Sequence, residues 1–388
     1  MSTTAIICEM NPLHLGHAYI LQEIKKTSDC VIAIMSGNFV QRAECALLDK
    51  YARAEAVIRA GADLVVELPF PWCSGGAEYF AAAGVALAHR LGADTLAFGV
   101  TADRGDLYAR VADVLLSPEF AREWQEERQR HPARGAAQSR QICLQKYFSE
   151  DLSGLLESPN DILAIEYVKS IRQGKYPLRI QPIKRLSGEE DPRFLGATSI
   201  RERLADGESV ADHLPEHSAV ILERERASGR IADADRLRDI LFCHLRRRCD
   251  GPAFAEGGGG VLERLVGCAE TTSNGLEMFR ASATKKYTNA RLRRAALFDI
   301  MAVGEDALRA LPAYTLLLGA TEAGRAYLSR SKKKFPIPVL TKPSDERKLD
   351  GVASAQYACA KEADRLYTLC QRSVAPADAY LRRTPYIE

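Results

Sequence analysis

The stretch Ile6-Ile7-Cys8-Glu9-Met10-Asn11-Pro12-Leu13-His14-Leu15-Gly16-His17 joins an apolar segment to an Asn-Pro turn and a His-x-Gly-His loop. Pro12 fixes its backbone φ angle and has no N–H to donate, so a strand that begins near residue 4 must end there. Gly16 lets the backbone come close to whatever occupies the loop. Apolar side chains then recur at helical spacing. We therefore predict a strand followed by a helix that begins between His14 and His17.

A helix that begins directly after a strand is a typical phosphate site, because its free N–H groups and positive dipole end face the loop. His14 and His17 are three residues apart, so both imidazoles can point the same way and donate to phosphate oxygens. The alternative is that they are surface or capping residues. Two histidines that bracket a glycine after a strand favour the phosphate site, and we predict His14 and His17 as its catalytic residues.

Length and composition suggest the broad class of protein. A chain of 388 residues with 46% hydrophobic residues is long enough for two domains. The net charge of +2 does not indicate a nucleic-acid partner, so any such surface must be local. The ten cysteines form neither a C-x-x-C pair nor a zinc-like pattern, which suits a reducing cytosol. There is no apolar run of membrane-spanning length and no signal-like N-terminus, so we expect a cytoplasmic protein without membrane contact. The sequence does not indicate an oligomeric state.

The first hundred residues alternate β-branched runs with amphipathic segments, which predicts a Rossmann-like parallel sheet with helical crossovers. Ligands of such sheets bind at the carboxyl ends of the strands. The expected strands are Thr4 to Cys8, Cys30 to Met35, Asp63 to Glu67 and Thr95 to Phe98, and the expected helices span 16–27, 50–61 and 77–91.

Polar or glycine-containing segments follow each of these strands, as expected for the rim of a pocket. They are residues 14–17, 36–39, 67–69 and Gly99. Gln41 and Arg42 could close over such a pocket, but the sequence does not decide whether the loop 36–48 does so. Lys50 and Arg53 start the next helix, either as solvated residues or as substrate contacts.

Residues 105–173 have helical patterns and are predicted as an insertion or lid and not as a fifth βα unit, after which Leu178 to Arg185 returns as a strand. Beyond about residue 210 the alternation ends. We therefore predict an α/β domain over 1–210 and a mainly helical domain over 211–388. Helical periodicity in the second part covers Arg236 to Arg248, Val261 to Met278, Thr288 to Met301 and Ala355 to Gln371.

A basic segment lies in this second half, at residues 285–294. A run of charge is usually only a solvated face. Here Lys and Arg alternate with Tyr287 and Asn289 at a helix start, a combination suited to RNA phosphates and an unstacked base. We predict an RNA-binding surface formed by Lys285, Lys286, Arg291 and Arg294.

The N-terminal stretch resembles the [T/H]xGH signature of the nucleotidyltransferase superfamily. Its Glu-x-Asn-Pro-x-His-x-Gly-His form is similar to that of the tRNA(Met) cytidine acetate ligases. Further blocks along the chain resemble the same family, namely residues 35–42, 50–53, 63–69, 98–99, 285–291, 317–319, 335–338 and 382–385. Cys8, Met10 and Leu15 depart from the residues common in the family, which affects the fine fit of the adenine or acetate and not the reaction class.

The resemblance implies an ATP-binding domain of the Rossmann-like HUP type and assigns its ATP contacts. Near residue 160 the alternative role is a helix cap by Asn160 or Asp161. Around residue 197 the segment resembles the second signature of the superfamily; the alternatives there are N-capping by Ser199 and a surface ion pair of Arg201. The implied ATP-binding residues are Ile7, Cys8, Glu9, Met10, Asn11, Pro12, Leu13, His14, Leu15, Gly16, His17, Ala18, Tyr19, Ile20, Gly99, Asn160, Arg185, Ser199 and Arg201.

The activity implied by the resemblance is an ATP-dependent ligation. Acetate is activated as acetyl-adenylate, and the acetyl group passes to N4 of the wobble cytidine of elongator tRNA(Met). Mg²⁺ is expected to arrive with ATP, because no carboxylate cluster in the sequence marks a protein-built metal site. One alternative is a small-molecule adenylyl- or cytidylyltransferase, which needs no basic helical half of this size. Another is a non-catalytic RNA-binding protein, against which the intact His-x-Gly-His loop argues.

Overall fold

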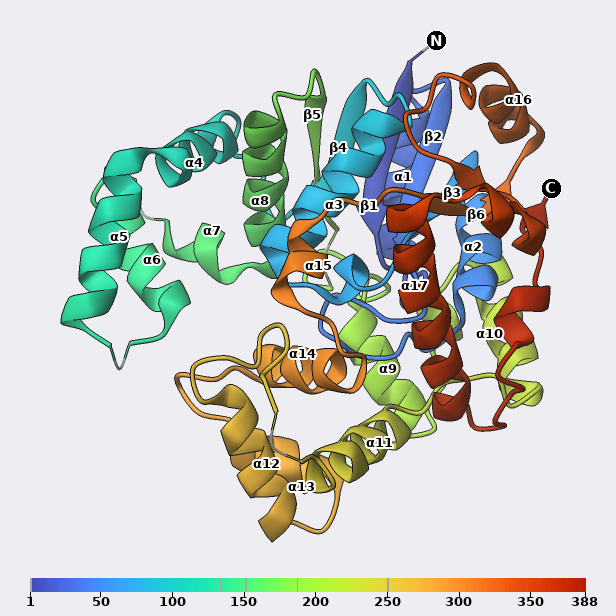
Figure 1. Ribbon diagram of the computed structural model, residues 1–388. Coiled ribbons are helices and arrows are strands. Elements are labelled where there is room, and N and C mark those ends of the chain that lie inside the picture. Colours follow the sequence, from blue (N-terminus) through green and yellow to red (C-terminus); the bar gives the residue numbers. More distant parts are fainter. Residues whose placement is uncertain (1, 133, 151, 187, 250) are drawn as a thin grey trace.

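A computed structural model of the chain describes residues 2–132, 134–150, 152–186, 188–249 and 251–388 (Figure 1). Its centre is a sheet in the order β5-β4-β1-β2-β3-β6-β7, with β8 paired to β6. The strands are β1 (Thr3–Cys8), β2 (Cys30–Ser36), β3 (Leu64–Leu68), β4 (Thr95–Val100), β5 (Arg179–Lys184), β6 (Thr315–Ala320), β7 (Val339–Leu340) and β8 (Tyr386–Ile387).

The first five strands are parallel, and β1 lies between β2 and β4. The strands predicted in this part of the chain are confirmed to within two residues. Helices α1 (Leu15–Lys25) and α2 (Lys50–Arg59) cover one face of the sheet, and α3 (Ala77–Arg90) and α8 (Pro159–Gly174) cover the other. The chain leaves β1 toward β2 on one side, whereas β4 lies on the other side. This reversal opens a crevice between the carboxyl ends of β1 and β4, where such sheets bind ligands.

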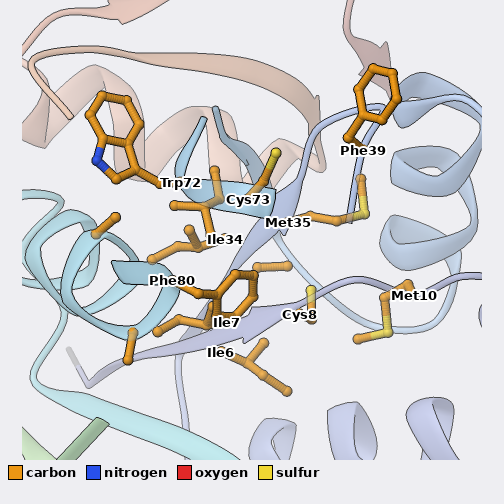
Figure 2. Close-up of a cluster of buried hydrophobic side chains, with 14 of the residues drawn as sticks. Ile6, Ile7, Cys8, Met10, Ile34, Met35, Phe39, Trp72, Cys73 and Phe80 are labelled. Atoms are coloured by element: carbon orange, nitrogen blue, oxygen red, sulfur yellow. The ribbon is translucent and has the colours of Figure 1, made fainter. Parts of the chain in front are cut away.

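The core beneath this crevice is apolar and closely packed. Figure 2 shows Ile6 and Ile7 of β1 with Ile34 and Met35 of β2 and with Phe80 of α3. Helix α3 approaches β1 so closely that a Cβ added at position 84 would lie 2.6 Å from Cδ1 of Ile7. Strand β1 is buried along its whole length, which fixes the position of the loop that follows it.

The segment between β4 and β5 is helical and extends to the left of the sheet in Figure 1. Its first helix packs on α8, and the next two helices pack on each other. The helices of this insertion are α4 (Leu107–Leu116), α5 (Pro118–Arg130), α6 (Ala136–Gln145) and α7 (Ser153–Glu157).

The chain after β5 is mainly helical. The predicted helix over Val261 to Met278 is wrong, because the chain breaks into α12 (Val261–Thr271) and α13 (Gly275–Ser282). The side chain of Asn274 accepts a hydrogen bond from the Glu277 N–H and caps the second helix. The helices of this part are α9 (Ala197–Ala205), α10 (Glu216–Ala227), α11 (Ala234–Arg246), α12 (Val261–Thr271), α13 (Gly275–Ser282), α14 (Asn289–Ile300), α15 (Glu305–Arg309), α16 (Glu322–Ser331) and α17 (Gly351–Cys370).

Strands β6 to β8 were not predicted from the sequence. Strand β6 runs antiparallel to β3 and extends the N-terminal sheet. The sheet therefore takes strands from both sides of residue 210, and the division of the chain at that residue stays a prediction. Among the described residues, no helix has both the length and the apolar composition needed to cross a lipid bilayer.

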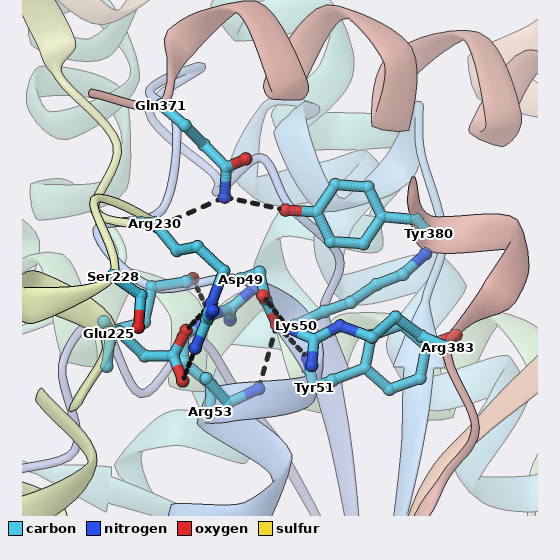
Figure 3. A network of polar contacts seen from close by, with 12 residues as sticks. Asp49, Lys50, Tyr51, Arg53, Glu225, Ser228, Arg230, Gln371, Tyr380 and Arg383 are labelled. Carbon is cyan, nitrogen blue, oxygen red and sulfur yellow. Dashed lines mark hydrogen bonds and ion pairs between the residues drawn. The ribbon is translucent and has the colours of Figure 1, made fainter. Parts of the chain in front are cut away.

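Buried polar contacts join α2 to the C-terminal segment (Figure 3). Lys50 lies 3.0 Å from Glu67 and 2.8 Å from Asp364, and Arg383 lies 2.6 Å from Asp49. The guanidinium of Arg53 is buried and donates to main-chain carbonyls, among them that of Glu9. The alternative that Lys50 and Arg53 are solvated is therefore wrong, since both side chains are buried, whereas their contact with substrate stays a prediction.

Candidate active site

A cavity of about 220 Å³ lies at the carboxyl ends of β1 and β4. It is bounded by α1, by the start of α8 and by the loop after β2. Ten of the predicted ATP-binding residues line it together, namely Ile7, Cys8, Glu9, Met10, Asn11, His17, Ile20, Gly99, Asn160 and Arg185. The cavity therefore lies where the sequence pattern predicts it, at the carboxyl ends of the parallel strands. The contact of each residue with ATP stays a prediction.

His14 and His17 stack at the start of α1, with ring centroids 3.7 Å apart and an angle of 29° between the planes. Gly16 makes this possible, because a Cβ there would lie 3.0 Å from Cε1 of His14. Nε2 of His14 and Nδ1 of His17 are buried and have no hydrogen-bond partner among the described residues. Buried polar atoms are nearly always paired, so two unpaired nitrogens in one place indicate a position for a polar ligand.

Both imidazoles are neutral in the folded chain. Burial lowers the pKa of His14 to about 3, with a further contribution from the charge of Arg185. Burial also lowers the pKa of His17, and the charges of His14 and Arg185 lower it further. Neutral imidazoles can donate one N–H each to an anion without competing for a proton near pH 7.

The N-terminus of α1 differs from the expectation of a row of free N–H groups. His14 is the N-cap, and its Nδ1 accepts a hydrogen bond from the Gly16 N–H at 3.1 Å. The proton of the neutral His14 ring is therefore on Nε2, the unpaired atom. His14 can therefore cap the helix through Nδ1 and still donate to a ligand through Nε2.

The loop after β2 is anchored beside the cavity by the residues of the Glu-x-Asn motif. The carboxylate of Glu9 accepts from the Gln41 N–H at 2.9 Å, and Oδ1 of Asn11 accepts from the Leu47 N–H at 2.7 Å. Gln41 and Arg42 consequently line the cavity, although they were not among the predicted site residues. The sequence signal for these two residues was their position after a glycine at the end of a predicted strand.

The remaining lining side chains missed by the sequence analysis are apolar ones. Phe80, Phe98, Leu163 and Tyr167 line the cavity together with His17 and Arg185. Their sequence pattern was that of ordinary core residues. The cavity thus combines an apolar region suited to a flat base with a cationic region suited to phosphate oxygens.

Gly99 and Arg185 are coupled sterically. A Cβ added at Gly99 would lie 3.0 Å from Cγ of Arg185 and 2.9 Å from Cδ1 of Ile20. Gly99 therefore leaves the room in which Arg185 reaches the cavity. Burial lowers the pKa of Arg185, and the charge of Asp161 opposes this effect. The guanidinium of Arg185 forms no ion pair with a carboxylate among the described residues.

The start of α8 corrects the capping alternative for residues 160 and 161. The cap is Ser158, whose hydroxyl accepts a hydrogen bond from the Asp161 N–H at 3.3 Å. Asp161 is buried and accepts instead from the hydroxyl of Tyr108 at 2.7 Å. Asn160 is thus free of the capping role and lines the cavity.

The second signature lies behind the loop that carries the histidines. Arg201 donates to the carbonyl of Asn11 at 2.8 Å, and its guanidinium lies 3.7 Å from Glu44. Ser199 is exposed and does not cap α9, whose N-cap is Gly196. Neither Ser199 nor Arg201 lines the cavity. The other predicted residues absent from the lining are Pro12, Leu13, His14, Leu15, Gly16, Ala18 and Tyr19, which form the turn and first turns of α1.

A cluster of arginines surrounds Glu44 next to the cavity. Glu44 pairs with Arg293 of α14 as well as with Arg201. Arg42 has no hydrogen bond or ion pair to any described residue. Burial of Arg293 lowers the pKa of that side chain, and the positive charge of Arg42 lowers it further. Two arginines thus share the carboxylate of Glu44, and Arg42, whose charge acts on both of them, lines the cavity.

The predicted RNA-binding residues lie around the start of α14. Lys285 and Lys286 have no carboxylate partner among the described residues, whereas Arg291 and Arg294 lie 3.6 and 2.9 Å from Glu256. All four line a second and larger cleft. In the described part of the chain, no group of three or more His, Cys, Asp or Glu side chains is placed to hold a metal ion.

Comparison with known proteins gives consistent matches over nearly the whole chain. A family model described as HIGH Nucleotidyl Transferase matches residues 1–380. A tRNA(Met) cytidine acetate ligase of Caldanaerobacter subterraneus is 32% identical over 98% of this chain and 95% of its own length. The Thermotoga maritima ligase is 34% identical over 88% of this chain and 87% of its own.

The fold also matches a solved structure. The crystal structure of Thermotoga maritima TmcAL bound with alpha-thio ATP superposes with a TM-score of 0.93 at 30% identity. The match covers 100% of this chain and 99% of that one.

Proposed function

The chain belongs to the HIGH nucleotidyltransferase family and, within it, to the tRNA(Met) cytidine acetate ligases, and we propose that it catalyses the reaction of that name. It activates acetate with ATP and transfers the acetyl group to N4 of the wobble cytidine of elongator tRNA(Met). The observation that carries this proposal is the cavity at the β1 and β4 ends, which His17 and Arg185 line. The ring of His14 stacks on that of His17, and each ring has a buried nitrogen without a partner among the described residues.

ATP occupies this cavity in the proposal. The adenosine lies toward the apolar wall of Phe98 and Leu163, near Gly99 and Asn160, and the phosphates lie toward the polar part. Support comes from the ATP analogue named for the similar Thermotoga maritima structure and from the absence of acidic residues other than Glu9 among the described lining residues. Glu9 is already occupied by the Gln41 N–H.

The first step is adenylate formation. A carboxylate oxygen of acetate attacks the α-phosphorus, an O–P bond forms, and the bond to the bridging oxygen breaks as pyrophosphate leaves. Negative charge grows on the α-phosphoryl oxygens, and preorganised donors at that position lower the barrier. His17 and His14 are proposed as those donors, with Arg42 and Arg185 beside the leaving pyrophosphate.

The second step is acyl transfer. The N4 amine of cytidine attacks the acetyl carbon, the carbon–oxygen bond to the phosphate breaks, AMP leaves and the amine loses a proton. Mg²⁺ is proposed to enter with the ATP phosphates and to neutralise part of their charge. A cytoplasmic location suits a tRNA substrate, and it also suits the ten cysteines, which are all free thiols.

The experiment that tests this function is ATP–pyrophosphate exchange with a panel of small carboxylates, with and without tRNA. We expect exchange with acetate in the absence of tRNA. Exchange that needs a larger carboxylic acid would contradict acetate as the acyl donor. Exchange that requires tRNA would contradict the proposed order of steps.

We predict that Arg42→Ala raises the KM for pyrophosphate in the exchange reaction about 10-fold or more. A charge-assisted hydrogen bond contributes about 1.5–3 kcal/mol, which corresponds to roughly 10- to 150-fold. The affinity for AMP should not change, because AMP lacks the leaving phosphates. Arg203→Ala is the matched control, since Arg203 is exposed on α9 and pairs with Glu208. Equal losses for pyrophosphate and AMP would contradict a specific contact of Arg42 with the leaving group.

We also predict that Lys285→Ala together with Lys286→Ala weakens tRNA binding and flattens its salt dependence. Each lost phosphate contact lowers the slope of log K against log salt by roughly 0.7 to 0.9. These two lysines hold no carboxylate in the described structure, so thermal stability should be unaffected. Binding isotherms between 50 and 300 mM salt test this, and an unchanged slope would reduce the two lysines to a solvated face.

A further inference from the structure

A cleft of about 1010 Å³ lies between the helical insertion and the segment that leads into α14. In Figure 1 the insertion stands above and to the left of α12 to α14. Trp124 and Arg128 of α5 lie on one side of the cleft, and Lys285 and Lys286 lie on the other. The two sides meet at Gly135, where an added Cβ would lie 3.6 Å from the carbonyl oxygen of Lys285. Segments far apart in the sequence thus form one surface.

The charge of this cleft is positive on both sides. Arg128 and Arg134 of the insertion and four cations of the segment 285–294 line it, and none of its described lining residues is acidic. Arg134 pairs with Glu127, and Arg291 and Arg294 share Glu256. Arg128, Lys285 and Lys286 have no carboxylate partner among the described residues. The cleft therefore suits a polyanion that contacts both walls.

The insertion wall also carries groups that suit nucleobases. The guanidinium of Arg128 lies 5.6 Å from the ring centroid of Trp124. Nε1 of Trp124 is buried and has no acceptor among the described residues. Three glutamines, Gln125, Gln129 and Gln138, line the same wall and can both donate and accept. Aromatic rings, amides and arginines together are typical of surfaces that bind unpaired RNA, whose bases stack on side chains.

The cleft is connected to the active site through α14. Arg291 and Arg294 of this helix line the cleft, while Arg293 of the same helix pairs with Glu44 in the loop beside the cavity. The insertion is connected as well, because α8 follows it directly and begins at the cavity with Pro159 and Asn160. RNA in the cleft would therefore lie next to both elements that border the site of chemistry.

Resting on the proposed tRNA-modifying function, we propose that helix α5 is the second wall of the RNA-binding surface. Arg128 contacts a phosphate, and Trp124 stacks on an unpaired base of the tRNA. The predicted basic segment 285–294 forms only the facing wall. The insertion is in this account a recognition element and not a lid over the nucleotide.

The experiment uses the intrinsic tryptophan fluorescence of the full chain, titrated with unmodified tRNA(Met) transcript. The chain has two tryptophans. Trp72 is 1% exposed and donates to the carbonyls of Leu308 and Ala310, so RNA cannot reach it. We expect quenching in the wild type and loss of that signal in Trp124→Phe, in which anisotropy of labelled tRNA still reports binding.

Affinity measurements complete the test. Trp124→Ala should weaken tRNA binding by between about 5-fold and 150-fold, the range for one lost stacked base. Arg128→Ala should lower the salt slope by roughly 0.7 to 0.9. Arg130→Ala is the matched control, because Arg130 lies two residues further along α5, pairs with Glu126 and does not line the cleft.

Three outcomes would overturn this inference. In the first, the wild type binds tRNA, and both Trp124→Ala and Arg128→Ala keep its affinity and salt slope. This result would contradict the role of α5 but not the proposed function. The second is equal quenching and competition by poly-glutamate, which would make the cleft a site for an acidic peptide. The third is no tRNA binding by the wild type, which also contradicts the tRNA part of the function. ATP–pyrophosphate exchange without tRNA then tests the adenylation part separately.

Discussion

His17→Ala is expected to slow ATP–pyrophosphate exchange by about 10²- to 10³-fold while the fold remains intact. The loss of one preorganised donor to a developing anion costs about 3–4 kcal/mol of transition-state stabilisation. Nδ1 of His17 is buried and unpaired in the described structure, so its replacement breaks no hydrogen bond of that atom within the protein. Rapid-quench or exchange kinetics with saturating ATP measures the effect on the chemical step.

His14 needs a different variant, because its Nδ1 also caps α1. His14→Ala removes the cap, at about 1 kcal/mol of stability, together with the donor. His14→Asn is the matched control, since asparagine is a favourable N-cap but does not reproduce an imidazole at the site. We expect His14→Asn to be as stable as the wild type and as slow as His14→Ala. Near-normal exchange in a folded His14→Asn or His17→Ala protein would show that these rings do not carry the chemistry.

The two histidines also make stability depend on pH. Their pKa values lie below the ordinary value of 6.5, at about 3 for His14, so the unfolded chain binds protons in a range where the folded chain does not. Stability is therefore complete above pH 6.5 and falls as the pH drops from there toward 3. The dependence should be shallower in His17→Ala, which urea unfolding between pH 4 and 8 can measure.

Lys50→Met is expected to lower the free energy of unfolding by about 3–5 kcal/mol, the cost of removing one partner from a buried ion pair. Lys50 is 2% exposed and neutralises Glu67 and Asp364. Burial lowers the pKa of Lys50, but the two carboxylates outweigh it and hold the pKa well above its usual value. Methionine fills the volume but leaves two carboxylates side by side without a cation.

Two further variants serve as controls for this prediction, one outside the Lys50 network and one within it. Lys26→Met removes an exposed lysine that pairs with Glu23 and should change stability by at most about 1 kcal/mol. Adding Glu67→Gln to Lys50→Met removes one of the two uncompensated charges and should restore part of the loss. Equal stability of Lys50→Met and Lys26→Met in urea unfolding would contradict a structural role for the Lys50 network.

The N-terminal βα units were predictable because their signals are local. Strand β1 ends at Cys8, ahead of Pro12, the apolar spacing after Gly16 defines α1, and the polar residues after each strand mark the edge where the cavity lies. Parallel strands buried on both faces have continuous apolar runs, which stand out between amphipathic helices. The position of the site follows from this topology. Both the topology and the site could therefore be predicted from the sequence.

The missed features depend on contacts between distant residues. Strand β6 is a six-residue apolar run within a helical region, and only its pairing with β3 makes it a strand. The charges of Lys50 and Arg53 suggested that both side chains face solvent. Lys50 is instead buried against Asp364, which is more than 300 residues away in the sequence. The contacts of Glu9 and Asn11 with ATP stay predictions, but the sequence did not show that their side chains also hold the loop after β2.

The most direct test of the proposed reaction combines purified protein, ATP, radiolabelled acetate and unmodified tRNA(Met) transcript. We expect label at the wobble cytidine only, with no need for acetyl-CoA. A transcript with uridine at that position lacks the N4 amine and should receive no label, while acetate-dependent ATP–pyrophosphate exchange continues at the wild-type rate. Label in a small metabolite, label at another nucleotide, or a requirement for acetyl-CoA would contradict the account.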